Sequence, residues 1–299
     1  MMTNKEITKL KPPLTFKEQL LKLQERGLEI DDEGIALEKL RMCNYYRLSA
    51  YTLHLKENDI FMPGTTFKQI ARLYDFDTHL RNLLLPMLER IEIAFRTHVA
   101  YLLATNYGNP QSYRNPSIFT DQNKHNDFLK KIDAEINKAS DAFIRHHKQH
   151  YDGQYPIWVV VEIMSFGTLS KLYENLKPYD QKQISSIYSI GSSYTIKWLH
   201  TLSYIRNLCA HYSRLYNRTL TKSPQLFRSE RKQIDNTKIF AGILIMKRLN
   251  IDNQAWDTFI TSLIGLIESY EDVVDLQLIG FPLNWLDLLN KPSYKHTDT

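Results

Sequence analysis

Apolar residues recur at intervals of three and four along most of the chain, the spacing that places them on one face of a helix. The longest stripe in the first half runs from residue 67 to about residue 107, and we expect Pro86 to kink or split its helix. A second stripe consists of Trp198, Leu199, Leu202, Ile205, Leu208, Cys209, Tyr212 and Leu215. The pattern predicts an all-α protein in which these two long helices contribute much of the core.

Capping and helix-breaking residues divide the rest of the chain. Thr15 and Glu18 form a capping box for a helix that Gly27 ends. Three carboxylates at residues 31–33 are expected to cap a helix at 35–41 rather than to bind a metal. Further helices are expected at 127–150, 157–173, 178–190, from Ser192 or Ser193 as cap to 218, at 236–249 and 253–266, with a basic loop at 219–231. The predicted organisation is an N-terminal helical region (1–70), a helical domain (71–250), and a C-terminal helical extension with a polar tail (251–299).

Composition places the chain among ordinary globular proteins. It has 299 residues, of which 43% are hydrophobic, with ten glycines and eleven prolines, so turn formers are few and helices are favoured. The two cysteines, Cys43 and Cys209, form neither a disulfide framework nor a zinc site. The apolar runs are too short to cross a bilayer and the amino terminus lacks a signal core. We expect a cytoplasmic protein that needs no cofactor.

Positive charge is concentrated in the last third of the chain. The formal net charge is +5, yet residues 206–248 alone contain ten Lys and Arg against Glu230 and Asp235, a local balance of +8. These ten are Arg206, Arg214, Arg218, Lys222, Arg228, Arg231, Lys232, Lys238, Lys247 and Arg248. Such a region favours a polyanionic partner, although a basic face that only keeps the protein in solution would have the same composition.

A stripe of unusual polar residues shares the helix with the second apolar stripe. Its members are His200, Tyr204, Asn207, His211, Arg214 and Arg218. Asn207 and His211 are one helical turn apart, and Arg206 points to the side, so Arg206 and His211 are expected to flank a groove. An arginine binds phosphate and a histidine transfers protons near neutral pH. Together these two groups could cleave RNA without a metal, by attack of a ribose 2'-hydroxyl on the neighbouring phosphorus.

Other polar clusters have simpler explanations. Glu92 and Arg96 are spaced for an i,i+4 ion pair, which is either a surface salt bridge or part of the same site. His146 and His150 have the spacing of zinc ligands, but no third ligand is evident, so exposed or RNA-facing histidines are favoured. The spacing of Arg206 and His211 is itself weak, since it also fits a helix end with a basic last turn.

Longer motifs strengthen the functional interpretation of Arg206 and His211. The stretch from Arg206 to Arg218, with Arg-Asn-Leu-Cys-Ala-His at its start, resembles the signature of the HEPN ribonucleases, and more narrowly their bacterial abortive-infection branch (Abi_2, AbiD/AbiF type). Further segments that resemble family landmarks in the family order are 45–51, 74–77 with Leu80 and Arg81, 89–97, and 165–170. The resemblance covers the chain from about residue 14 to residue 218.

The resemblance implies an all-α HEPN-type bundle with additional N-terminal and C-terminal helices, and a metal-independent endoribonuclease in phage defence. It implies a homodimer in which two copies complete one site. Arg206, Asn207 and His211 would be catalytic, Glu92 would orient them, and RNA would contact Tyr204, Arg214, Arg218, Arg96, Lys222, Arg228, Arg231 and Lys232.

Two alternatives stay open at this stage. The protein could chiefly hold a cognate small structured RNA, with cleavage latent or absent, because related systems encode such an RNA beside the protein. It could also be an inactive helical scaffold, although packing alone would not require both an arginine and a histidine with an asparagine between them.

Overall fold

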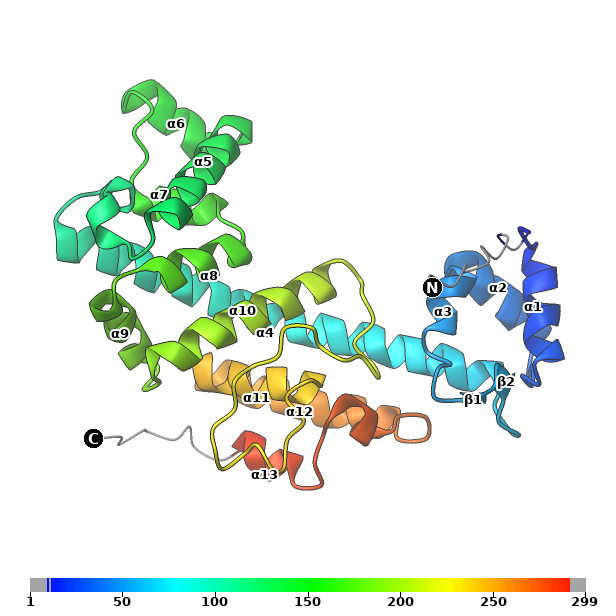
Figure 1. Ribbon diagram of the computed structural model, residues 1–299. Coiled ribbons are helices and arrows are strands. Elements are labelled where there is room, and N and C mark those ends of the chain that lie inside the picture. The colour runs from blue at the N-terminus through cyan, green and yellow to red at the C-terminus, as the bar shows by residue number, and fades with distance from the viewer. Residues whose placement is uncertain (1–9, 11, 291–299) are drawn as a thin grey trace, which may run out of the picture. The chain divides into compact units, whose positions relative to one another are not determined.

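A computed structural model describes residue 10 and residues 12–290, and within them it is built almost entirely of helices (Figure 1). The α-helices are α1 (Phe16–Glu25), α2 (Glu33–Met42), α3 (Tyr45–Ser49), α4 (Phe67–Tyr107), α5 (Gln122–Lys138), α6 (Ala142–His150), α7 (Ile157–Ile163), α8 (Phe166–Asn175), α9 (Pro178–Ile187), α10 (Ser192–Ala210), α11 (Ile239–Leu249), α12 (Asn253–Ser269) and α13 (Trp285–Asn290). Short 3-10 helices are η1 (Ser112–Arg114), η2 (Pro116–Ile118) and η3 (Leu276–Ile279). The prediction of an all-α protein is confirmed.

The chain forms two compact units, which we describe separately. The first unit contains residues up to Asp77 together with 272–274, and the second contains the rest of the described chain. The second unit therefore includes most of the predicted 71–250 domain and, apart from residues 272–274, the described part of the predicted C-terminal extension. The predicted polar tail from residue 291, and residues 1–9 and 11 of the predicted N-terminal region, lie outside the described residues.

Local capping chemistry determines the helices of the first unit. The Thr15 and Glu18 capping box is present as predicted, and Gly27 ends the helix region with a φ of 84°. The Asp32 side chain caps α2 by accepting from the Ile35 amide. A short hairpin of β1 (Lys56–Glu57) and β2 (Ile60–Phe61) was not predicted, and its two turn residues both adopt positive φ, as a tight hairpin requires.

Helix α4 passes through Pro86 without interruption, so of the two predicted effects, a kink or a split, the split is wrong. Proline removes one backbone hydrogen bond and crowds the preceding turn. On either side of Pro86, Leu84, Met87 and Leu88 are buried in the core. This packing holds the helix together across the lost bond, as tertiary contacts commonly do for an unfavourable helix residue.

Two predicted helices are each broken in two. The expected helix at 127–150 is α5 and α6, which are separated by residues 139–141. The expected helix at 157–173 is α7 and α8, because the Ser165 hydroxyl accepts from the Thr168 amide and so begins a new helix. Helix α10 begins after Gly191 with no side-chain cap, so the predicted serine cap is also wrong.

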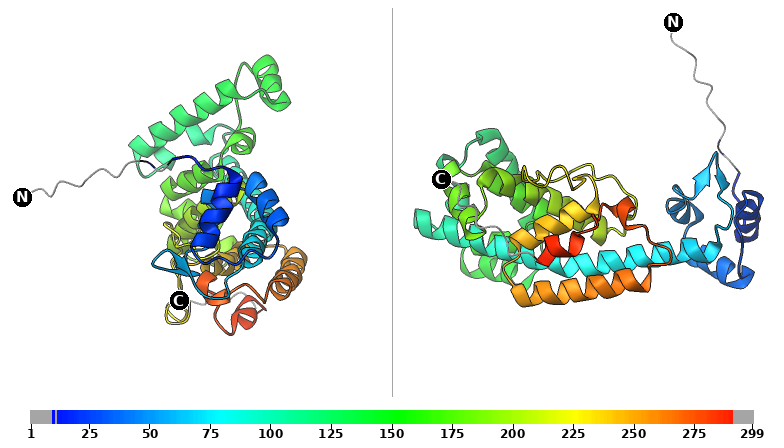
Figure 2. Two further views of the ribbon diagram at one scale, coloured as in Figure 1. Left: turned by 90° about the vertical axis from the view of Figure 1, so that its right-hand side faces the viewer. Right: turned by 90° about the horizontal axis from the view of Figure 1, so that it is seen from below.

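Helix α10 lies in the core of the second unit. It packs against α8, α9 and α11, and Figure 1 shows it crossing beside α8. Its Ile205 side chain lies so close to Gly242 of α11 that a side chain there would collide with it. Helix α12 runs alongside α4, as the right-hand view of Figure 2 shows. An ion pair at 3.0 Å links Arg90 of α4 to Asp252, the residue before α12. These contacts fix the helices that carry the predicted site residues.

A search of the described residues for a helix long and apolar enough to cross a membrane gave none.

Candidate functional site

A buried carboxylate connects the two helices that carry the predicted site. Glu92 of α4 is only 6% exposed, and it lies between Arg96 of the same helix and Arg206 of α10. Its Oε2 accepts from Nε and Nη2 of Arg206, both at 3.2 Å, and its Oε1 accepts from Arg96 Nη2 at 2.6 Å. A two-point contact of this kind fixes the plane of a guanidinium as well as its position. Arg206 is therefore held in one orientation on the side of α10.

Arg96 also caps the C-terminal end of a neighbouring helix, α7. Its Nη1 donates to the carbonyls of Val161 and Glu162, both at 2.7 Å, and its Nη2 donates to the Met164 carbonyl at 2.6 Å. The last carbonyls of a helix have no partner within it, so Arg96 satisfies the end of α7. The N–H groups of Arg96 that bind Glu92 and α7 are therefore engaged in hydrogen bonds within the protein.

The end of α10 places His211 in an exposed position. His211 is the C-terminal cap residue, Tyr212 follows with a φ of 57°, and the Ser213 amide donates to the Leu208 carbonyl at 2.8 Å. The Tyr212 amide donates to the Cys209 carbonyl at 3.1 Å. This pair of bonds is the Schellman arrangement, in which glycine normally occupies the left-handed position. A tyrosine there is strained, and such strain clusters at functional sites.

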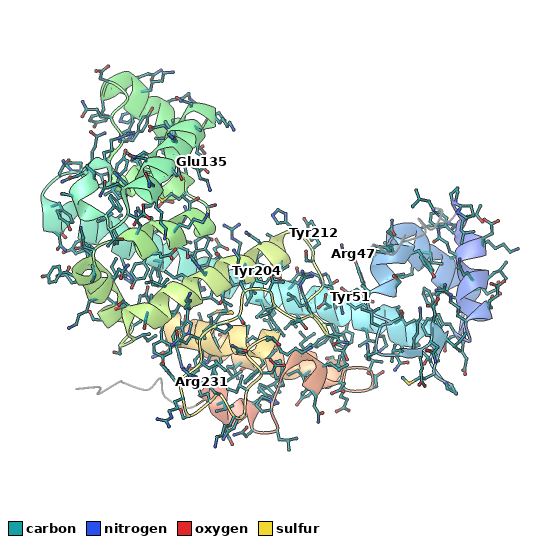
Figure 3. All side chains as sticks on the ribbon, in the orientation of Figure 1. Arg47, Tyr51, Glu135, Tyr204, Tyr212 and Arg231 are labelled. Carbon is teal, nitrogen blue, oxygen red and sulfur yellow. The ribbon has the colours of Figure 1, made fainter. Side chains whose placement is uncertain are left out.

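Asn207 and His211 are exposed, one helical turn apart, and Arg206 is partly buried. The Arg206 Nη1 donates to the Asn207 side-chain oxygen at 3.2 Å, and the His211 amide donates to the Asn207 carbonyl at 3.0 Å. Asn207 thus contacts Arg206 through its side chain and His211 through the main chain. The three residues lie at one end of one helix, next to the exposed ring of Tyr212, which Figure 3 shows beyond the end of α10.

Arg214 and Arg218 do not continue the stripe, because α10 ends at Ala210. The Arg214 guanidinium donates to the carbonyls of Tyr216 at 2.7 Å and Asn217 at 3.1 Å, so it braces the turn after the helix. Arg218 lies close to Tyr204 on α10. Burial alone would raise the pKa of the Tyr204 phenol, but neighbouring polar groups of Thr221 and Arg218 outweigh burial and lower the pKa.

The basic segment is less positive on its surface than its composition suggests. Arg248 is buried and binds the buried Glu230, and its guanidinium stacks 4.3 Å from the Phe227 ring centroid. Lys247 donates to the Leu288 carbonyl at 3.0 Å. Of the predicted RNA contacts in this segment, Lys222, Arg228, Arg231 and Lys232 are exposed. Figure 3 shows Arg231 well separated from Tyr212, so these cations do not all gather around His211.

His200, one turn before Tyr204, pairs with another helix. Its Nε2 lies 3.3 Å from a carboxylate oxygen of Glu174 on α8. Burial lowers the pKa of His200; the Glu174 carboxylate partly opposes this, and the nearby Lys222, Lys197 and Lys171 add to it. His200 is therefore a link between α8 and α10 at the far end of the stripe from His211.

Sequence reasoning missed two features of this site. The strained Tyr212 has no sequence signal, because glycine or asparagine is the usual marker of a left-handed helix end. The Glu174–His200 pair joins residues 26 positions apart and depends on how α8 packs against α10. Within the part of the chain that the structure describes, no group of three or more histidine, cysteine or acidic side chains could hold a metal ion.

Comparison with known proteins gives a family for the chain. The model of the Abi-like protein family matches residues 38–217, a span that contains Glu92, Arg96 and the whole of α10 with His211. No curated protein and no solved structure gives a significant match. The matched span covers more than half of the sequence, and the chain belongs to the Abi-like protein family.

Proposed function

We propose that this protein is a metal-independent endoribonuclease that acts in abortive-infection defence against phage. The observation that carries the proposal is the buried Glu92 carboxylate, which holds the Arg206 guanidinium against the Asn207 side chain on the helix that ends at the exposed His211. Phosphodiester transesterification needs a fixed cation and a group that transfers protons, and this end of α10 carries one of each. Membership of the Abi-like family supports the defence role.

The proposed reaction uses the RNA's own 2'-hydroxyl as nucleophile. His211 takes the proton from this hydroxyl, the 2'-oxygen forms a bond to phosphorus, and the bond from phosphorus to the 5'-oxygen of the next nucleotide breaks. The departing 5'-oxygen takes up a proton, and the products are a 2',3'-cyclic phosphate and a 5'-hydroxyl. Arg206 offsets the negative charge that builds up on the phosphoryl oxygens, and Asn207 positions the phosphate.

One chain supplies one His211, whereas the reaction needs both a proton acceptor and a proton donor. A second copy of the chain, related by two-fold symmetry, would supply the second imidazole, so the working form is a homodimer with the ends of two α10 helices facing each other. The exposed Tyr212 ring beside His211 would then stack on an RNA base. Lys222, Arg228, Arg231 and Lys232 would contribute phosphate contacts farther along the strand.

In this account, Arg96 is a positioning residue. Its hydrogen bonds to Glu92 and to the end of α7 support the carboxylate that in turn holds Arg206. Arg214 similarly supports the turn that follows His211. Contacts of either arginine with RNA stay predictions.

The chemistry of the products tests the proposal. We expect RNA incubated with the protein in excess chelator to yield 2',3'-cyclic phosphate and 5'-hydroxyl ends, because the 2'-oxygen attacks and no metal is needed. A substrate with a single 2'-deoxynucleotide at a mapped cleavage site should not be cut there, and it should compete for binding as well as the all-ribose RNA. Cleavage at the deoxy position, or 5'-phosphate products, would rule out this reaction.

The same ion pair also supports the alternative that the protein chiefly holds a cognate RNA. Because Glu92 offsets the charge of Arg206, the site in a single chain is held in a less cationic form, as expected for latent cleavage. Sequencing of RNA that copurifies with the intact protein distinguishes the two functions. One discrete, uncleaved RNA species supports the holding function, and a free protein that cleaves added RNA supports the nuclease.

A further inference from the structure

Helix α10 and the chain that follows it form a segment without acidic residues. Residues 181–229 contain seven lysines and arginines and neither Asp nor Glu. Carboxylates reach α10 from other helices: Glu92 of α4 binds Arg206, and Glu174 of α8 lies beside His200. Because the charged side chains of the segment itself are all positive, its surface favours an anionic partner wherever those carboxylates are already paired.

His200 and His211 lie on the same side of α10, and Tyr204 lies between them (Figure 3). They are eleven positions apart, which is about three helical turns, so their side chains point in similar directions. At a rise of about 1.5 Å per residue, the two histidines are about 16 Å apart along the helix axis. A single RNA strand a few nucleotides long would cover this distance.

Three lysines from three different segments lie near the His200 end of this surface. Lys171 is on α8, Lys197 is on α10 one turn before His200, and Lys222 is in the loop after α10. All three are exposed. Burial lowers the pKa of His200 most, and each of the three lysines lowers it further. Their ammonium groups therefore act together at the position of this one imidazole.

The charges of these three lysines are not offset by ion pairs. Among the described residues, none of the three ammonium groups pairs with a carboxylate. The carboxylate that acts on His200 is Glu174, and it is shared by His200 Nε2 at 3.3 Å and by Lys124 at 3.8 Å. The surface around His200 therefore has an excess of positive charge. Lysine binds phosphate as a point charge, so such a surface suits a phosphate group.

We propose that Lys171, Lys197 and Lys222 form a second phosphate site, the lysine site, which holds the RNA backbone a few nucleotides away from the phosphate at His211. The strand would lie along the side of α10 that faces away from the core. Lys222 was predicted as an RNA contact from the sequence, whereas Lys171 and Lys197 were not. The choice of RNA as the source of the phosphate rests on the proposed function, and the anion site itself rests on the charges around His200.

The salt dependence of RNA binding tests the lysine site. The probe is a fluorescent ten-nucleotide RNA with 2'-O-methyl groups, which has no nucleophile for the proposed cleavage, so binding to the full-length protein is measured alone. The double variant Lys171→Gln with Lys197→Gln should make the slope of log affinity against log salt shallower by about 1.4, because each phosphate contact to a single strand contributes about 0.7. Its affinity at physiological salt should fall about threefold to tenfold. Lys130→Gln with Lys138→Gln is the matched control, since both lysines are exposed on α5.

The proposal is overturned if the Lys171 and Lys197 double variant has the slope and affinity of the control. It is also overturned if inorganic phosphate binds as tightly as the RNA, because the site would then take a free anion rather than a strand.

Cleavage of unmodified RNA separates this proposal from the nuclease proposal. If the wild type cleaves, the double variant should raise KM and leave kcat within about twofold, since the lysine site is far from the reacting phosphate. A parallel fall in kcat would place these lysines in the reaction and overturn the lysine site. A protein that binds as expected but does not cleave retains the lysine site and loses the nuclease. A protein that cleaves, but whose salt slope is unchanged by the double variant, retains the nuclease and loses the lysine site.

Discussion

Glu92 of α4 and Arg206 of α10 form a two-point ion pair, with Glu92 Oε2 3.2 Å from both Nε and Nη2 of Arg206. The two residues are 114 positions apart in sequence, so the pair exists only because the helices pack together. The carboxylate both orients the guanidinium and offsets its charge. Catalysis and RNA affinity should therefore respond differently when the carboxylate is removed.

Glu92→Gln keeps the size and one oxygen acceptor of the side chain but removes its charge. We expect the cleavage rate at saturating RNA to fall about tenfold to a hundredfold, because Arg206 is less well oriented. RNA affinity should stay equal or rise, since Arg206 is no longer offset. Glu89→Gln, an exposed neighbour on α4, is the control. Loss of RNA affinity in parallel with the rate would show that Glu92 has another role.

Tyr212→Gly should stabilise the protein. Tyr212 has a φ of 57° and is 70% exposed, so glycine relieves about 1 kcal/mol of backbone strain and loses little packing. Tyr212→Ala is the matched comparison because it removes the ring and keeps the strain. Thermal melts should place the glycine variant above the alanine variant by roughly 2–4 °C. Equal melting temperatures would mean that the left-handed conformation costs nothing here.

The buried pair of Arg248 and Glu230 should be costly to break from one side. Arg248→Met leaves the Glu230 carboxylate buried without its partner, and we expect a loss of about 3–5 kcal/mol in the free energy of unfolding. The double variant Arg248→Met with Glu230→Gln removes both charges and keeps an acceptor for the Phe227 amide, so it should be more stable than Arg248→Met alone. Denaturant unfolding measures both, and a double variant less stable than the single one would contradict the argument.

Stability should fall in mild acid in part through His98. Burial lowers the pKa of His98 below its ordinary value, and its Nδ1 forms a hydrogen bond of 2.9 Å with the Tyr188 hydroxyl. The unfolded chain then binds the proton more readily than the folded protein, so this contribution is complete above a pH of about 6.5 and is lost as the pH falls through the folded pKa. His98→Asn should show a smaller drop in melting temperature between pH 7.5 and pH 5 than the wild type. A drop of equal size would remove His98 from the pH dependence.

Local signals in the sequence predicted the helices well where capping chemistry marks their ends. The capping box of Thr15 and Glu18 and the cap at Asp32 are side-chain hydrogen bonds within three residues, so sequence spacing alone identifies them. The family motifs identified the segment that the Abi-like family model matches. Spacing left the Glu92–Arg96 pair open between a surface salt bridge and part of the same site; the family resemblance favoured the site, and Glu92 contacts both Arg96 and Arg206.

Errors arose where packing outweighs local preference. Pro86 remains within a continuous helix because buried neighbours hold it, and α10 ends at Ala210 because Tyr212 accepts a conformation that tyrosine disfavours. Formal charge was also a poor guide to surface charge, since the positive balance counted for residues 206–248 includes Arg248, which is buried with Glu230. Periodicity and composition contain no information on such long-range partners.

The cleavage rate of the His211→Ala protein tests the central claim most directly. The wild type, His211→Ala and His150→Ala proteins should be compared on one RNA in excess chelator, with matching thermal melts to establish that each is folded. His150 is a suitable control because it too is an exposed histidine at the end of a helix. We predict that His150→Ala cleaves like the wild type and that His211→Ala, fully folded, cleaves at least about a hundredfold more slowly. Cleavage by folded His211→Ala at the wild-type rate would contradict the account.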